Sequence, residues 1–251
     1  MRECIKNNII LIFLIIIPIL SLLIGFFLNE DLSTGGSKWD FDLTWPIVIN
    51  YSNLNFSTDI TRHMPLHYVL LSLANVSFND QNLVKIFYLF FSFLLPIFLY
   101  LNLTKIYNYK KSILIIFSSC FLFIPLFRAS AIWSNAHLTA TIFFLIGNFF
   151  YLKSQKKDIF IYKILNLLFL SLAIYCIQTY LLLFLFYLYN YFSSEKINNF
   201  IKLFLFSALL SLPGLFFIIL NPRIIDLGNV MSRDIFYTIS NNFSVIFFFL
   251  L

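Results

Sequence analysis

Charged residues are scarce in this chain. Only 11% of its 251 residues are Asp, Glu, Lys or Arg, whereas 61% are hydrophobic and 20% are aromatic. Soluble domains usually carry about 25% charged residues. The composition therefore excludes an ordinary soluble protein and indicates a polytopic membrane protein.

Cysteine is also rare, and the common cofactor motifs are missing. Cys4, Cys120 and Cys176 lie near the N-terminus and in apolar runs, without the spacing of a disulfide framework or a zinc site. The sequence has no P-loop, dinucleotide-binding, HExxH or nucleophile-elbow pattern. We therefore expect neither a metal nor a cofactor.

Long hydrophobic runs are what the chain does contain. About 20 apolar residues cross a hydrocarbon core of about 30 Å as a helix, which satisfies its own backbone groups. The runs predict one all-α transmembrane domain over 1–251, with about seven to eight spanning helices. A tight turn near Gln178-Thr179 divides the longest apolar stretch. The runs fall at 7–28, 83–103, 112–127, 137–152, 159–178, 179–192, 200–220 and, incompletely, 243–251.

The distribution of charge predicts the topology. The first run follows Arg2 and Lys6 and exceeds the roughly 7 to 15 apolar residues of a signal peptide, so we expect an uncleaved anchor with a cytoplasmic N-terminus. The inner segments then carry eleven basic against three acidic residues, and the outer segments six against eight. This follows the positive-inside rule in a bacterial inner membrane or the endoplasmic reticulum. It assigns the net charge of +6 to topology and not to nucleic-acid binding.

The first outer loop, 29–82, is the main candidate for a functional region. It is too long for a simple connection and too aromatic for disorder. We expect a short helix at Leu43–Tyr51 after Asp42, and an interfacial helix at Leu66–Val76 with Pro65 in its first turn. A late outer loop, 221–242, adds Arg223 and could form a second wall of the site.

Two acids open the polar part of the first loop. Asp40 and Asp42 point the same way on an extended segment, but diverge by about 200° on a helix. One interpretation is a solvated pair, with Asp42 as a helix cap. The other is a general base that removes a proton from an acceptor hydroxyl.

The remaining polar residues have both structural and functional interpretations. Arg62, His63 and His67 could hold a phosphate, whereas Pro65 makes a metal pair of the two histidines unfavourable. Arg128 could snorkel at the surface, or belong to the site. Residues that open a span or form a turn could equally be caps or site residues: Asn135, His137 and Gln178.

The spacing of the first loop resembles one family. Asp40, Pro46 and Tyr51 stand as in the opening motif of the dolichyl-phosphate-glucose α-1,2-glucosyltransferases, a family of the GT-C class of polyprenyl-phosphate-sugar-dependent glycosyltransferases. Phe41 replaces the family's second acid. Further segments that are similar to family motifs are Ile60-Thr61, Pro65 with Tyr68, 177–180 and 221–224.

The resemblance implies a GT-C-like bundle and a metal-independent, inverting sugar transfer on the non-cytoplasmic face. Asp40, or Asp42 instead, would deprotonate the acceptor. The partners would be a polyprenyl-phosphate-linked sugar donor, a glycan or lipid-linked acceptor, and membrane lipids. Arg62, Arg128 or Arg223 would stabilise the departing phosphate. The other residues expected to contact substrate are Trp45, Tyr51, His63, His67, Asn135, His137 and Gln178.

Three other functions compete with this one. A lipid-linked saccharide transporter should carry charged or broken helices near the midplane, and the runs contain few. A polysaccharide polymerase would place its main loop late in the chain. A non-catalytic membrane subunit or fragment is the third, because the last run stops within 243–251.

Overall fold

A computed structural model describes residues 2–32, 36–56 and 63–220, and all regular secondary structure in these ranges is helical. The predicted all-α class is therefore confirmed. Arg62, Arg223, the late outer loop and the final apolar run lie outside the described residues. The α-helices are α1 (Arg2–Phe27), α2 (Gly36–Ser52), α3 (Leu66–Phe78), α4 (Gln81–Ser92), α5 (Leu94–Ile106), α6 (Lys111–Cys120), α7 (Pro125–Ile132), α8 (Ala136–Lys156), α9 (Phe160–Cys176), α10 (Leu181–Ser194) and α11 (Ile197–Leu220); the 3₁₀ turns are η1 (Phe121–Phe123) and η2 (Gln178–Tyr180).

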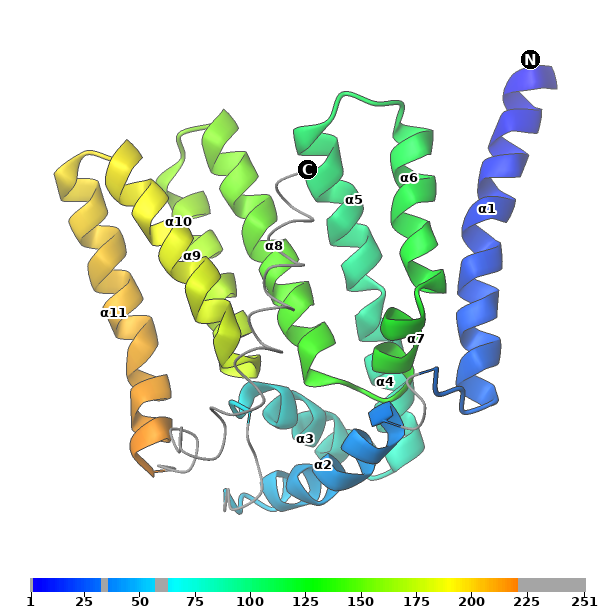
Figure 1. Cartoon of the computed structure of the whole chain (residues 1–251), viewed down its shortest axis with the longest axis horizontal. Coiled ribbons are helices and arrows are strands. Elements are labelled where there is room, and N and C mark those ends of the chain that lie inside the picture. The colour runs from blue at the N-terminus through cyan, green and yellow to red at the C-terminus, as the bar shows by residue number, and fades with distance from the viewer. Residues whose placement is uncertain (1, 33–35, 57–62, 221–251) are drawn as a thin grey trace.

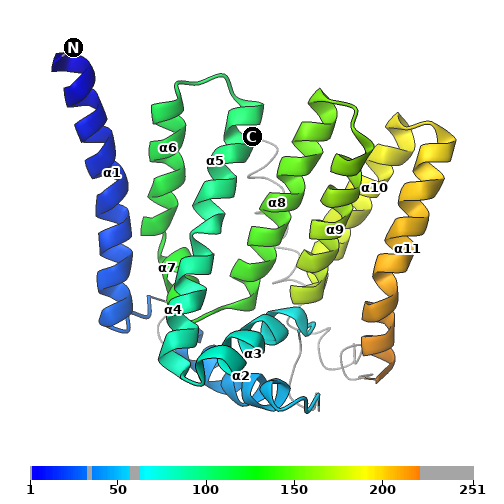
Figure 2. The same cartoon turned by 180° about the vertical axis from the view of Figure 1, so that it is seen from behind.

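The helices form an upright bundle with two helices lying across one end. In Figures 1 and 2, α1, α5, α6 and α8 to α11 run roughly side by side, and α2 and α3 lie across the lower end. The start of α1 and the α5–α6, α8–α9 and α10–α11 connections lie at the other end (Figure 1). The lysines that set the predicted charge asymmetry lie in these connections or within about two turns of the adjoining helix ends. We call the α2–α3 end of the bundle the crossed end.

The number of clear membrane spans is lower than predicted. In the described part of the chain, Gln81–Ile106 and Ile197–Phe217 are long and apolar enough to cross a membrane, and α6 with α7 makes a third if the pair bent by 66° is one span. The expected count of seven to eight is not supported by this criterion. One reason is length, because α9 has 17 residues and α10 has 14, whereas a span needs about 20.

The predicted break in the longest apolar stretch is confirmed. Helix α9 ends at Cys176, Ile177 is extended, and Gln178–Tyr180 forms the turn η2 before α10 begins at Leu181. The connection lies at the crossed end (Figure 1). A short polar break was therefore enough to locate a helical hairpin.

The first outer loop is more helical than predicted. Helix α2 begins at Gly36, and not near Leu43, and the Asp31 carboxylate accepts a hydrogen bond of 2.9 Å from the backbone N–H of Lys38 in its first turn. Asp42 lies inside this helix, so its predicted role as a cap is wrong. The predicted helix after Pro65 is confirmed, since α3 begins at Leu66; its interfacial position stays a prediction.

The Tyr175 side chain of α9 contacts the backbone of α11 beside Pro213. Pro213 has no N–H to donate within the helix. The Tyr175 hydroxyl of α9 donates to the carbonyl of Leu210 and accepts from the N–H of Gly214 at 3.1 Å. A Cβ on Gly214 would stand 2.7 Å from the Tyr175 ring, so glycine allows this close approach.

Amide and phenol side chains join the bundle helices. Asn102 of α5 donates to the Leu145 carbonyl of α8 at 2.9 Å, and Asn166 of α9 donates to the Gly147 carbonyl at 2.9 Å. Tyr191 of α10 then donates to Asn166 at 3.1 Å. Such bonds between helices stabilise membrane bundles by about 0.6 kcal/mol each on average. They join α5 to α8, α8 to α9 and α9 to α10.

Candidate functional site

Asp40 lies where α2 crosses the end of the bundle. Ile47 and Tyr51 follow it by seven and eleven residues, which places all three on one face of the helix. Ile47 and Tyr51 are buried, so Asp40 continues a buried stripe toward a more open position. Its charge acts on the nearby Tyr68 of α3 and His137 of α8. Three helices therefore meet around this carboxylate.

The pKa of Asp40 is raised above the ordinary aspartate value. The Asp40 side chain is exposed, and partial desolvation of its carboxylate is the main cause of the shift; the charge of His137 opposes it, and that of Asp31 adds to it. Asp40 has no hydrogen bond or ion pair within the described ranges. A carboxylate with an increased affinity for protons and no fixed partner is suited to act as a general base.

His137 lies near Asp40, and its ring contacts that of His63. The rings of His63 and His137 meet edge to face with centroids 5.5 Å apart. Asn135 caps α8, because its side-chain oxygen accepts a bond of 2.8 Å from the His137 N–H. The first turn of α8 thus holds His137 near Asp40, and the predicted residues Asp40, His63, Asn135 and His137 come together.

His67 is placed differently from the other histidines. It is buried, and its Nδ1 bonds to the Thr139 hydroxyl at 2.9 Å while its Nε2 bonds to the Ser134 carbonyl at 2.8 Å. Burial lowers the pKa of His67 to about 3, so the ring is neutral. Both nitrogens are engaged in joining α3 to α8, which leaves none for substrate. We therefore correct its predicted role to a structural one.

Arg128 is also engaged within the protein. Its Nε donates to Glu30 Oε1 at 2.8 Å and its Nη2 to Glu30 Oε2 at 2.5 Å, while Nη1 and Nη2 reach the hydroxyl and carbonyl of Ser21, each at 3.0 Å. The Trp133 indole N–H donates to the Glu30 carbonyl at 2.9 Å. We call Glu30 and Arg128 the α1 clamp, since they join the end of α1 to α7. The geometry does not support the predicted phosphate-binding role of Arg128.

Lys85 was not singled out from the sequence, although it lies deep in the crossed end. Its side chain is buried, with the ammonium 3.8 Å from the ring centroid of Trp133 and 3.4 Å from the side-chain oxygen of Asn29. The sequence around a lysine at the start of a span does not indicate whether its side chain will be buried. Here the cation stabilises the packing of α4 against α7 through a cation–π contact.

The other predicted residues lie apart from Asp40. Asp42 is exposed, diverges from Asp40 by about 200° around α2, and acts on Lys85. Trp45 packs against Phe41, with ring centroids 5.6 Å apart. Tyr51 is buried, and its hydroxyl has no hydrogen-bond partner in the described part of the chain. Gln178 is exposed in η2.

No group of three or more His, Cys, Asp or Glu residues able to hold a metal ion occurs among the described residues. Arg62 and Arg223, the other predicted phosphate ligands, fall in the ranges that the structure does not describe. The crossed end thus places the Asp40 carboxylate near His137, whose ring contacts that of His63. No protein-family model, curated protein or solved structure matches the chain.

Proposed function

We propose that this protein is a membrane glycosyltransferase that moves a sugar from a polyprenyl-phosphate-linked donor to a hydroxyl of a glycan or lipid-linked acceptor. The observation that carries the proposal is the Asp40 carboxylate, whose pKa burial raises and which has no ion pair in the described ranges. A transferase that activates a hydroxyl needs such a base.

In the proposed reaction, Asp40 accepts the proton of the acceptor hydroxyl. The hydroxyl oxygen attacks the anomeric carbon, and the bond between this carbon and the phosphate oxygen breaks with its electron pair leaving on the phosphate. Attack from the opposite face inverts the anomeric carbon. His137, near Asp40, and His63, whose ring contacts that of His137, are suited to hold the sugar hydroxyls by hydrogen bonds.

The departing phosphate needs a positive partner. Arg128 is excluded from this role by its bonds to Glu30, so the proposal keeps Arg62 and Arg223. Arg62 directly precedes His63 in the sequence, which gives it the shorter tether to Asp40. Both assignments rest on sequence position.

We also propose that the crossed end faces the non-cytoplasmic side. The support is the separation of α2 and α3 from the lysine-rich connections, which lie at opposite ends of the bundle (Figure 1). The finer proposal of seven to eight spans requires α9 and α10 to cross a locally thinner bilayer, an adjustment that costs a fraction of a kcal/mol per Å.

The test is a transfer assay on membranes that contain the full chain, supplied with radiolabelled polyprenyl-phosphate sugars and a set of glycan and lipid-linked acceptors. A new glycosidic bond, identified in the extracted product, is the expected result. Asp40→Asn should reduce its formation by at least about 100-fold. Asp42→Asn is the matched comparison, since it removes the same charge on the other side of α2, and should retain transfer.

Other outcomes would decide against the proposal. Movement of the donor lipid without a new glycosidic bond would indicate a transporter. Equal loss of transfer in both aspartate variants would indicate a general effect of charge and not base catalysis. Normal transfer in Asp40→Asn, with the protein present at wild-type levels, would remove Asp40 from the mechanism.

A further inference from the structure

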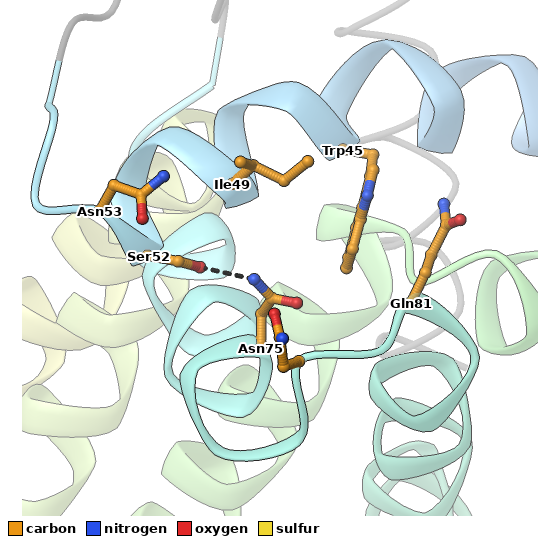
Figure 3. A pocket seen from close by; sticks show the side chains of 7 residues that line it. Trp45, Ile49, Ser52, Asn53, Asn75 and Gln81 are labelled. Carbon is orange, nitrogen blue, oxygen red and sulfur yellow. Dashed lines mark hydrogen bonds between the residues drawn. The ribbon is translucent and has the colours of Figure 1, made fainter.

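A polar hollow lies on the other side of α2 from Asp40. It has a volume of about 350 Å³ and is formed between α2, α3 and the turn that leads into α4 (Figure 3). We call it the Trp45 pocket. Its lining residues are Trp45, Ile49, Ser52, Asn53, Asn75, Asn79 and Gln81.

The helical spacing separates this pocket from the proposed transfer site. Trp45 and Ile49 follow Asp40 by five and nine residues, which turns them by about 140° and 180° away from it around α2. Asp40 shares its face with the buried Ile47 and Tyr51 instead. A ligand in the Trp45 pocket would therefore not contact the Asp40 carboxylate.

The lining combines one flat aromatic ring with amides. Trp45 is half-buried and is held by Phe41, at 5.6 Å between ring centroids. Four of the seven lining residues, Asn53, Asn75, Asn79 and Gln81, carry a primary amide, and none carries a formal charge. Each amide both donates and accepts hydrogen bonds. Sugar hydroxyls also do both, and the C–H face of a sugar ring fits against an indole ring.

The floor of the pocket is ordered before any ligand binds. The Asn75 amide donates to the Ser52 hydroxyl at 3.0 Å, and this hydroxyl donates to the Val48 carbonyl at 2.8 Å (Figure 3). Asn79 ends α3 in the left-handed conformation, with a φ of 48°, and its N–H donates to the Asn75 carbonyl. Because these bonds fix the side chains of Ser52 and Asn75, ordering these two groups would add little to the cost of binding.

We propose that the Trp45 pocket binds an uncharged saccharide unit. A charged headgroup is a poorer match, because its charge would lose water without gaining an opposite charge from the lining. The size of the pocket, at the lower end of the usual range of about 300 to 1,000 Å³ for ligand sites, suits a small ligand. This inference does not depend on sugar transfer, since it concerns binding alone.

The test measures binding to the purified full chain in nanodiscs, without any donor lipid. A glycan array that includes neutral glucose, mannose and N-acetylglucosamine oligosaccharides, with sulfated and sialylated counterparts, identifies the probe. Its dissociation constant is then measured by calorimetry. We expect neutral glycans to bind, and Trp45→Ala to weaken the binding of the best one by at least tenfold.

Matched variants separate recognition from folding. Trp39→Ala removes the exposed tryptophan six residues earlier on α2, and should leave the dissociation constant unchanged. The double variant N53A/Q81A changes two exposed lining residues, and should weaken binding at least fivefold with an unchanged melting temperature. Absence of neutral-glycan binding, equal binding by Trp45→Ala, a preference for acidic glycans, or competition by glycerophosphoglycerol would overturn the proposal.

Discussion

Glu30 and Asp40 are two acids of the same first loop, ten residues apart, and the fold places their carboxylates in different surroundings. Glu30 is bonded to Arg128 at 2.8 Å and 2.5 Å. Asp40 has no ion pair within the ranges described, although it lies close to His137. A paired acid stabilises the structure, whereas an unpaired and partly desolvated acid is suited to chemistry.

The pKa values of the two acids move apart for physical reasons. The hydrogen bonds and charge of Arg128 lower the pKa of Glu30, against the effect of burial. Burial raises the pKa of Asp40. The first acid is therefore more stable ionised in the folded protein than in the unfolded chain, and the second is less so.

Breaking the α1 clamp should give the largest effect on stability. Arg128→Ala leaves the Glu30 carboxylate half-buried and unpaired, so we expect a loss of about 3 kcal/mol in the free energy of unfolding. The measurement is denaturant unfolding of the full chain in micelles. The double variant E30Q/R128Q should recover part of this loss, because neither side chain is then charged. A loss under about 1 kcal/mol in Arg128→Ala would show that the clamp is not structural.

The pH dependence of transfer should report Asp40. A base works only when deprotonated, so the rate should rise with pH through the pKa of Asp40 and then level off, with the rise above the ordinary aspartate range because burial raises this pKa. The measurement is the rate of sugar transfer by intact membranes between pH 4 and 8. A rate that is flat across the ordinary aspartate range and above would contradict this assignment.

Lowering the pH should remove the contribution of the Glu30 charge to the stability of the fold. The folded-state pKa of Glu30 lies below its unfolded value. Its contribution to stability is therefore present above the unfolded pKa, near 4.5, and is lost as the pH falls through the lowered folded-state pKa. Glu30→Gln should be less stable than the wild type at pH 7, and the difference should shrink below about pH 4.5. A difference independent of pH would mean that the Glu30 charge does not stabilise the fold.

The smallest effect should come from Asp40 itself. Its folded-state pKa is raised, so the ionised form is slightly unfavourable to folding at neutral pH, and this cost is absent once the group is protonated. Asp40→Asn should keep the wild-type melting temperature or raise it by about 2 °C at pH 7. A clear loss of stability would show that Asp40 has a structural role similar to that of Glu30.

Local signals predicted several elements correctly. Pro65 marked the start of α3, and the polar residues Gln178 and Thr179 marked the turn between α9 and α10. Both depend on neighbours in the chain, since proline favours the first turn of a helix and a polar break interrupts an apolar run. The start of α2 was missed, and the acid that bonds its first turn, Asp31, precedes the helix by several residues.

Contacts over long distances explain the errors at the site. Arg128 and His67 had the residue types of phosphate or sugar ligands, but their partners lie 98 and 72 residues away in sequence, at Glu30 and Thr139. Spacing within the first loop contains no information about such partners. The spacing within the first loop likewise does not predict the Trp45 pocket, which forms only where the end of α3 lies against α2.

The sequence by itself determined the membrane class, the helical content and the separation of charge between the two ends, because these follow from composition and from patterns a few residues long. Only the tertiary structure decided which polar side chains are hydrogen-bonded or ion-paired within the protein and which are not. Glu30 and His67 are bonded within the fold, whereas the Asp40 carboxylate is exposed and has no ion pair in the described part of the chain. The reason is physical, since a side chain's proton affinity and reach are set by the neighbours that folding brings to it.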